Sequence, residues 1–203
     1  MMAGNNADLA VTMLDLGDPA QAQAVEDYVM GHADGTPFHR PAWMRAMTQA
    51  TGHRAIMLAA VAPSGRINGI LPLHHVKSRL FGAALVSSAF AVDGGILADD
   101  ARAVAALARA AEGLAREQGG LSLELRGGPV PGEGWTLHEG GHLRFVRPIA
   151  EDDEAELLAV PRKHRAELRK ALANPALTVD HGRSPAHLRD HYRIYAECVR
   201  NLG

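Results

Sequence analysis

The sequence predicts an α+β or α/β domain in which helices cover the faces of a mixed sheet. Segments with strand-like and helix-like periodicity follow one another in the order strand, two helices, several strands, long helix and strand. In addition, 47% of the 203 residues are hydrophobic, which is enough for a sizeable core. This regular order ends near residue 150, where the composition changes.

The first elements are a short strand and two helices. Residues 9–16 alternate as a strand does. Asp18 followed by Pro19 is typical of a helix start, because aspartate caps free backbone N–H groups and proline fits the first helical position. Residues 41–51 predict a second helix that begins with proline and ends before Gly52.

The next part of the chain has the pattern of a hairpin and further strands. Two apolar runs within residues 55–76 flank the turn sequence PSGR, which predicts an antiparallel pair. Residues 82–97 are again strand-like, and Gly94 and Gly95 interrupt them. His74 and His75 are adjacent, so in a strand they should face opposite sides of the sheet.

The longest predicted helix follows, capped by Asp99 or Asp100 and ended by Gly119 and Gly120. Its apolar stripe consists of Val104, Leu107, Ala111 and Leu114. Residues 121–125 predict a strand with leucine at every second position. A Pro/Gly-rich loop and a pair of strands within residues 137–149 are expected to complete this part.

Residues 151–203 differ in character. An acidic and a basic helical segment meet at Pro161, a short strand is expected at 176–182, and a helix is expected from Ser184. One stripe of that last helix is apolar, and it consists of Leu188, Tyr192, Tyr195, Val199 and Leu202. Such a stripe needs a partner surface, so we expect it to pack on the first domain, to belong to a longer sequence of which this is the front part, or to form a homodimer.

Composition excludes several classes of protein. A net charge of −2 and a pI near 6.6 argue against a protein that coats nucleic acid, DNA included, or membrane with its whole surface, so anion recognition must be local. A single cysteine allows no internal disulfide and suits a reducing compartment. Neither a leader, a membrane-spanning segment nor a metal-ligand spacing is evident, which favours a cytoplasmic protein without a metal.

The basic segment 161–173 is the clearest local exception to the balanced charge. It contains Arg162, Lys163, Arg165, Arg169 and Lys170 with one acid, Glu167. One interpretation is a solvated helix face whose wet side is basic. The other is a phosphate site, because a helix that begins at Pro161 places cations near the positive end of its dipole, where an anion would stabilise them. On this second interpretation the ligand is a nucleotide, a tRNA or a diphosphate-linked substrate.

Several words of the sequence resemble the FemAB family, in particular the branch found with exosortase and PEP-CTERM systems in exopolysaccharide loci. The most specific are LPLHHVKSRLFG and FAVDGGILADD; others are FHRPAWMRAMTQATGHRAIMLAA, LSLELRG, VPRKHRAELRKAL and YRIYAECVRNLG. The resemblance runs from about residue 38 to residue 203. It implies tandem GNAT-like domains, the first at residues 1–150 and the second, beginning but incomplete, at 151–203, so the chain looks truncated.

The same resemblance implies an activity. FemAB-type proteins transfer an aminoacyl group from aminoacyl-tRNA to an amine of a cell-envelope precursor, so this chain is expected to act on a phosphate-bearing small molecule or tRNA. No catalytic residue is predicted. The expected substrate-binding residues are Arg162, Lys163, Arg165, Arg169, Arg200 and Lys77, where Arg200 matches a phosphate-contacting arginine of the family and Lys77 a family word. His39, Trp43 and Asp93 also match family words and are expected to be packing and turn residues.

Two alternatives remain open. An acetyl-CoA-dependent GNAT acetyltransferase would need a glycine-rich pyrophosphate loop before a helix, and the sequence has none that fits. A non-catalytic interaction fragment would associate through the stripe of the last helix. No permanently bound cofactor is expected, and aminoacyl-tRNA or acyl-CoA is the expected donor.

Overall fold

The computed structural model describes residues 9–141 and 145–203, and the chain divides into two units, residues 1–139 and 140–203. The expected boundary at residue 150 therefore falls inside the second unit. The assignment of both parts as GNAT-like domains stays a prediction.

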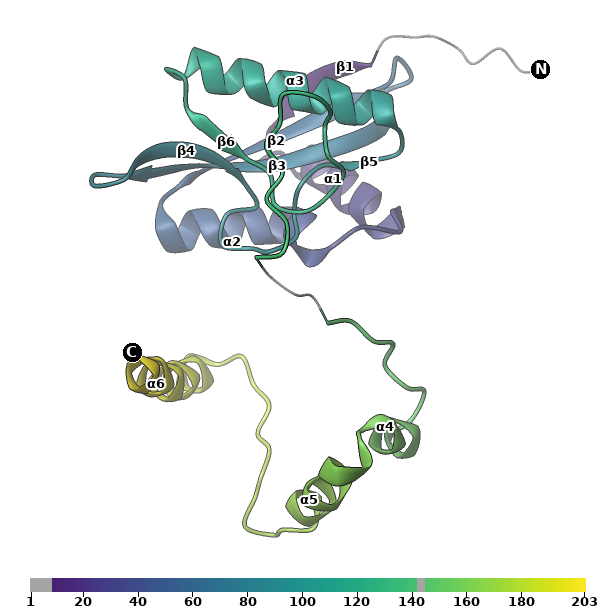
Figure 1. Cartoon of the computed structure of the whole chain (residues 1–203), viewed down its shortest axis with the longest axis vertical. Coiled ribbons are helices and arrows are strands. Elements are labelled where there is room, and N and C mark those ends of the chain that lie inside the picture. Colours follow the sequence, from purple (N-terminus) through teal and green to yellow (C-terminus); the bar gives the residue numbers. More distant parts are fainter. Residues whose placement is uncertain (1–8, 142–144) are drawn as a thin grey trace, which may run out of the picture. The chain divides into compact units, whose positions relative to one another are not determined.

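The first unit contains a mixed six-stranded sheet, as predicted (Figure 1). Its strand order is β1-β2-β3-β4-β6, and β5 pairs with the first part of β3. All neighbours are antiparallel except β4 and β6, which are parallel. The strands are β1 (Ala10–Leu14), β2 (Arg54–Val61), β3 (Ile67–Ser78), β4 (Gly82–Ser87), β5 (Leu97–Ala98) and β6 (Ser122–Glu124).

Helices cover both faces of this sheet (Figure 1). One face carries α1 (Pro19–Gly31) and α2 (Pro41–Thr51), joined through the 3-10 turn η1 (Pro37–His39), and the other carries α3 (Ala101–Glu117). The predicted ends are confirmed: the Asp18 carboxylate accepts the N–H of Ala20, and Gly52 ends α2 at a φ of 73°.

The two-residue period of the strands divides the core into two layers. Ile56 and Leu58 of β2 pack with Leu107 of α3, whereas Met57 packs with Met44 of α2. All five side chains are at most 5% exposed. Each face of β2 therefore buries its own helix contacts, which is why this strand is almost continuously apolar.

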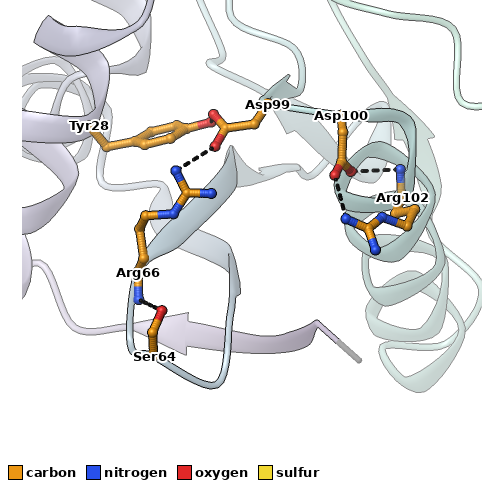
Figure 2. A network of polar contacts seen from close by, with 6 residues as sticks. All are labelled: Tyr28, Ser64, Arg66, Asp99, Asp100 and Arg102. Carbon is orange, nitrogen blue, oxygen red and sulfur yellow. Dashed lines mark hydrogen bonds and ion pairs between the residues drawn. The ribbon is translucent and has the colours of Figure 1, made fainter. Parts of the chain in front are cut away.

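Two adjacent acids that could each cap α3 have separate roles (Figure 2). Asp100 is the N-cap and accepts the backbone N–H groups of Arg102 and Ala103, both at 2.9 Å. Asp99 instead accepts the Tyr28 hydroxyl at 2.9 Å and lies 3.6 Å from the Arg66 guanidinium. Burial of Tyr28, together with Asp99, raises the pKa of the phenol, and the contact joins α1 to β5.

A proline inside β3 explains why β4 and β5 pair with different parts of the same edge of this strand. Pro72 has no N–H for the ladder, and its carbonyl accepts the N–H of Ser88 at 2.9 Å, just beyond the last β4 pair, Leu73 with Ser87. The chain then leaves the sheet and pairs again only as β5, opposite Gly69 and Ile70. The intervening loop, residues 88–96, therefore occupies the middle of this edge.

The second unit contains α4 (Asp153–Ala159), α5 (Arg162–Leu172) and α6 (Pro185–Leu202). The prediction of two helices meeting at Pro161 is confirmed, although Pro161 is the N-cap of α5 and not its first residue. Ser184 caps α6 as predicted, accepting the N–H of His187. None of the described residues of this unit is buried, so the apolar stripe of α6 is exposed and its pairing in a homodimer stays a prediction.

Two expected strand regions are wrong where the structure describes them. Residues 176–182 form no strand, and neither do 137–141 and 145–149, while 142–144 lie outside the described residues. Their apolar side chains, such as Phe145 and Val179, are exposed. Alternation alone predicts a strand, but a strand also needs a neighbouring edge to bind its backbone, and within the described chain these segments have none.

Candidate functional site

The predicted cations of the second unit lie on exposed helices. Arg162, Lys163 and Arg169 of α5 are exposed and form no ion pair with the described residues, and the same holds for Arg200 of α6. Because Arg162 is the first residue of α5, two cations do lie at the positive end of its dipole. These features suit an anion site and a solvated face equally.

The other two cations of α5 have local partners. Arg165 is half-buried, and its Nε donates to the carbonyl of Val160 at 2.8 Å, which fixes α5 against the end of α4. Lys170 is 2.9 Å from Glu167 one turn earlier. Arg165 therefore has a structural contact that the sequence did not reveal.

Lys77 belongs to the first unit, where it joins a group of basic residues that we call the cationic rim: His53 and Arg54 at the start of β2, and His75 and Lys77 near the end of β3. Arg54 and His75 are cross-strand partners. Partial burial, then the charges of Lys77, Arg54 and His53, lower the pKa of His75. His75 is therefore neutral at pH 7, and the fixed charges of the rim are those of Arg54 and Lys77.

Next to the rim, the loop that follows β4 has a strained backbone. Ser88 and Phe90 have φ angles of 39° and 66°, a region that residues with side chains rarely adopt and that costs about 1–3 kcal/mol per residue. Phe90 is 56% exposed. Its ring is stacked on the ring of His53, with 6.0 Å between the two ring centroids and an interplanar angle of 2°. The loop thus presents an accessible aromatic face beside the cations.

A buried histidine holds this strained loop in place. His74 is fully buried, and its Nδ1 accepts the N–H of Ala89 at 3.2 Å, which places the proton of the neutral ring on Nε2. Burial lowers the pKa of His74, an effect that the backbone of Met44 opposes. His75, on the other face as predicted, is half-buried.

A second buried histidine fixes the neighbouring turn. His39 is 4% exposed, and its Nδ1 accepts the N–H of Thr36 at 3.2 Å. The Thr36 hydroxyl donates to the carbonyl of Asp93, and the Ser88 hydroxyl donates to that of Phe38, so η1 is tied to the loop at two points. The expected turn role of His39 is thereby confirmed.

Arg126, just after β6, joins the ends of the two parallel strands. Its backbone N–H donates to the Ser87 hydroxyl at 2.8 Å, and its backbone carbonyl accepts the N–H of Gly94. Its guanidinium donates to the carbonyl of Ala91 at 3.3 Å. Because β4 and β6 are parallel, both carboxyl ends meet at this point. The sequence did not indicate that Arg126, Ser88 and His74 hold this loop. The run SSAFAVDGG, which follows a strand, was the signal that could have indicated a special loop here.

A cavity of about 660 Å³ lies beside the end of β1 and the start of β2, and Arg54 of the cationic rim is among the residues that line it. The turn that follows β1, the α2 face with Arg45 and Thr48, and Met57 line it. None of the predicted substrate-binding residues does so.

The described residues hold no group of three or more histidine, cysteine, aspartate or glutamate side chains that could bind a metal ion. Within the same residues, no helix is both long and apolar enough to span a bilayer. Comparison with family models, with curated proteins and with solved structures found no match to this chain. The assignment of a function therefore depends on the geometry and on the sequence words.

The buried histidines make stability depend on pH. Burial lowers the pKa of His39 and His74 below the ordinary value of 6.5, so the unfolded chain binds protons first as the pH falls. The stability that these two neutral histidines allow is therefore full above about pH 6.5 and decreases as the pH falls below it. We expect the free energy of unfolding of the first unit to fall between about pH 7.5 and pH 5, as urea denaturation at each pH would measure.

The variant His74→Gln should reduce this pH dependence, since a glutamine side chain cannot titrate. An unchanged slope in His74→Gln would contradict the assignment of His74 as a buried neutral group.

Proposed function

We propose that the protein is an acyltransferase of the FemAB type, with a GNAT-like fold in its first unit, that moves an aminoacyl or acyl group to an amine of a phosphate-bearing envelope or exopolysaccharide precursor. The proposal places this reaction in the cytoplasm, where aminoacyl-tRNA and acyl-CoA are available. One observation carries it: the carboxyl ends of the parallel strands β4 and β6 meet at a strained loop whose Phe90 ring stacks on His53 of the cationic rim. Ligands of sheet proteins commonly bind outside such strand ends.

Each part of this place has a role in the proposed reaction. Arg54 and Lys77 would contact the phosphate of the acceptor, and the Phe90 ring would lie against a sugar or base. The cations of α5 and Arg200 belong to the second unit and are proposed as a phosphate-binding group of that unit by itself. His39, His74 and Arg126 are buried or engaged with the backbone, so they position the loop and do not touch the substrate.

Direct transfer is the proposed chemistry. The deprotonated amine attacks the carbonyl carbon of the donor ester or thioester, a C–N bond forms, and the C–O or C–S bond breaks as the alcohol or thiol leaves with a proton. No covalent enzyme intermediate is needed, so the protein contributes mainly by positioning the two reactants. The single cysteine, Cys198, is exposed on α6 and has no assigned role.

The proposal is tested by offering the full chain a labelled aminoacyl-tRNA or acetyl-CoA together with glucosamine 1-phosphate, an amine that carries a phosphate. Transfer to this acceptor should exceed transfer to glucosamine. Removing one solvated charge-assisted contact should lower kcat/KM by about fivefold in Lys77→Ala, and the double change Arg162→Ala with Arg169→Ala should lower it by about tenfold or more.

The matched control is Arg109→Ala, which removes an exposed cation of α3 and should have no effect. Absence of transfer from either donor, or equal rates in all variants, would contradict the proposal. Transfer from acetyl-CoA alone would replace it with the acetyl-CoA-dependent alternative.

A further inference from the structure

The end of the β3–β4 hairpin exposes two large apolar side chains. Leu80 is 87% exposed and Phe81 is 90% exposed. β2 begins at Arg54, the partner of His75, and β6 begins at Ser122, the partner of Ala84. The last two pairs of the hairpin, Lys77 with Ala83 and Ser78 with Gly82, therefore have no third strand beside them. The hairpin therefore continues past the sheet as a two-stranded arm (Figure 1).

The turn at the end of this arm is a built structure. The Ser78 hydroxyl oxygen accepts the N–H groups of both Leu80 and Phe81 at 3.2 Å, and Gly82 has a φ of 80°. A hydroxyl that binds two successive N–H groups and a glycine in the left-handed region are standard means of fixing a tight turn. The apolar pair is thus held out into solvent, where its exposure has no benefit for the fold.

Two cations flank the apolar tip, and no acidic residue lies near it in the sequence. Lys77 and Arg79 flank the turn, and both are exposed. Between Asp34 and Asp93 the chain contains no aspartate or glutamate, although its overall net charge is −2. No described acid forms an ion pair with Lys77 or Arg79. The arm therefore combines a protruding apolar end with an unneutralised positive charge.

We propose that this arm inserts Leu80 and Phe81 into the surface of a bilayer that contains anionic lipids, while Lys77 and Arg79 contact the lipid headgroups. Apolar residues that enter the headgroup boundary with cations behind them are the general means of peripheral membrane binding. A protein partner fits less well, since a stable interface covers about 800 Å² on each side, far more than two side chains supply. Lys77 also belongs to the cationic rim, but the inference rests on the exposed tip and needs neither donor nor acceptor, so it can hold or fail independently of the proposed transferase activity.

The test measures sedimentation of the full chain with vesicles of phosphatidylcholine alone and with vesicles in which a third of the lipid is phosphatidylglycerol. Wild-type protein should bind the anionic vesicles, and the binding should weaken at high salt. Leu80→Ser with Phe81→Ser should abolish binding. Lys77→Gln with Arg79→Gln should lower the partition constant by about 25-fold, since each cation near a charged surface contributes about fivefold.

Two controls localise the effect. Met30→Ser, which removes a side chain that is 67% exposed on α1, should leave binding unchanged. Leu188→Ser with Tyr192→Ser, on the exposed stripe of α6, should also leave it unchanged. In addition, Phe81→Trp should show a blue shift of its emission with anionic vesicles, and Phe90→Trp should not.

Three results would overturn the proposal: no binding by the wild type, binding that the α6 variant loses and the hairpin variant retains, or equal binding to neutral and anionic vesicles. Unchanged circular dichroism of the hairpin variants would show that a loss of binding does not reflect unfolding. Self-association of the wild type that the hairpin variant lacks, without vesicle binding, would assign the arm to a contact between two copies instead.

Discussion

Replacing Gly95 with alanine should destabilise the first unit by about 3 kcal/mol or more, because overpacking against the backbone has no flexible side chain to relieve it. A Cβ at this position would lie 1.9 Å from the carbonyl oxygen of Gly127. The two segments that follow β4 and β6 would have to separate. Both tryptophans, Trp43 and Trp135, belong to this unit, so their fluorescence during urea denaturation measures the effect.

Gly113→Ala is the matched control for this change. Gly113 lies inside α3, and a Cβ there would meet nothing within 4 Å. Alanine at an open helical position should stabilise the protein by about 0.5–1 kcal/mol. Similar stabilities of the two variants would show that the loops after β4 and β6 are not in close contact.

Leu107→Ala should lower the free energy of unfolding by about 2–5 kcal/mol, the usual range for a buried leucine whose removal leaves a cavity. Leu107 is fully buried on the side of α3 that faces the sheet, in the same apolar cluster as side chains of β2, β3 and β4. The same tryptophan measurement reports the change.

Leu172→Ala makes the same chemical change at a leucine that is 73% exposed at the end of α5. It should change the stability of the first unit by less than about 0.5 kcal/mol. If Leu107→Ala were equally mild, α3 would not be packed on the sheet in the way described.

Most of the first unit could be predicted from the sequence because its signals are local. Asp18 caps the start of α1 and Gly52 ends α2, and both effects depend only on neighbouring residues. The PSGR turn likewise forms the β2–β3 hairpin without contacts to distant residues. The separate roles of Asp99 and Asp100 were beyond such reasoning, since the partners of Asp99, Tyr28 and Arg66, are distant in sequence.

The candidate site was predicted less well for the same reason. Lys77 was identified from a sequence word, but its neighbours Arg54 and His75 come together only through the β2–β3 register. Arg126 acts on Ser87, 39 residues away, and no periodicity indicates such a contact. The expected strands at 137–149 and 176–182 failed because alternation carries no information about a pairing edge.

The most direct test of the account is to locate the bound phosphate ligand. Titration of isotope-labelled full chain with glucosamine 1-phosphate, followed by amide chemical shifts, should give saturable shifts at His53, Lys77 and the loop 88–95, none of which lines the cavity beside β1. Shifts confined to the cavity beside β1, or no saturable shift at all, would contradict the claim that the carboxyl ends of β4 and β6 and the cationic rim form the substrate site.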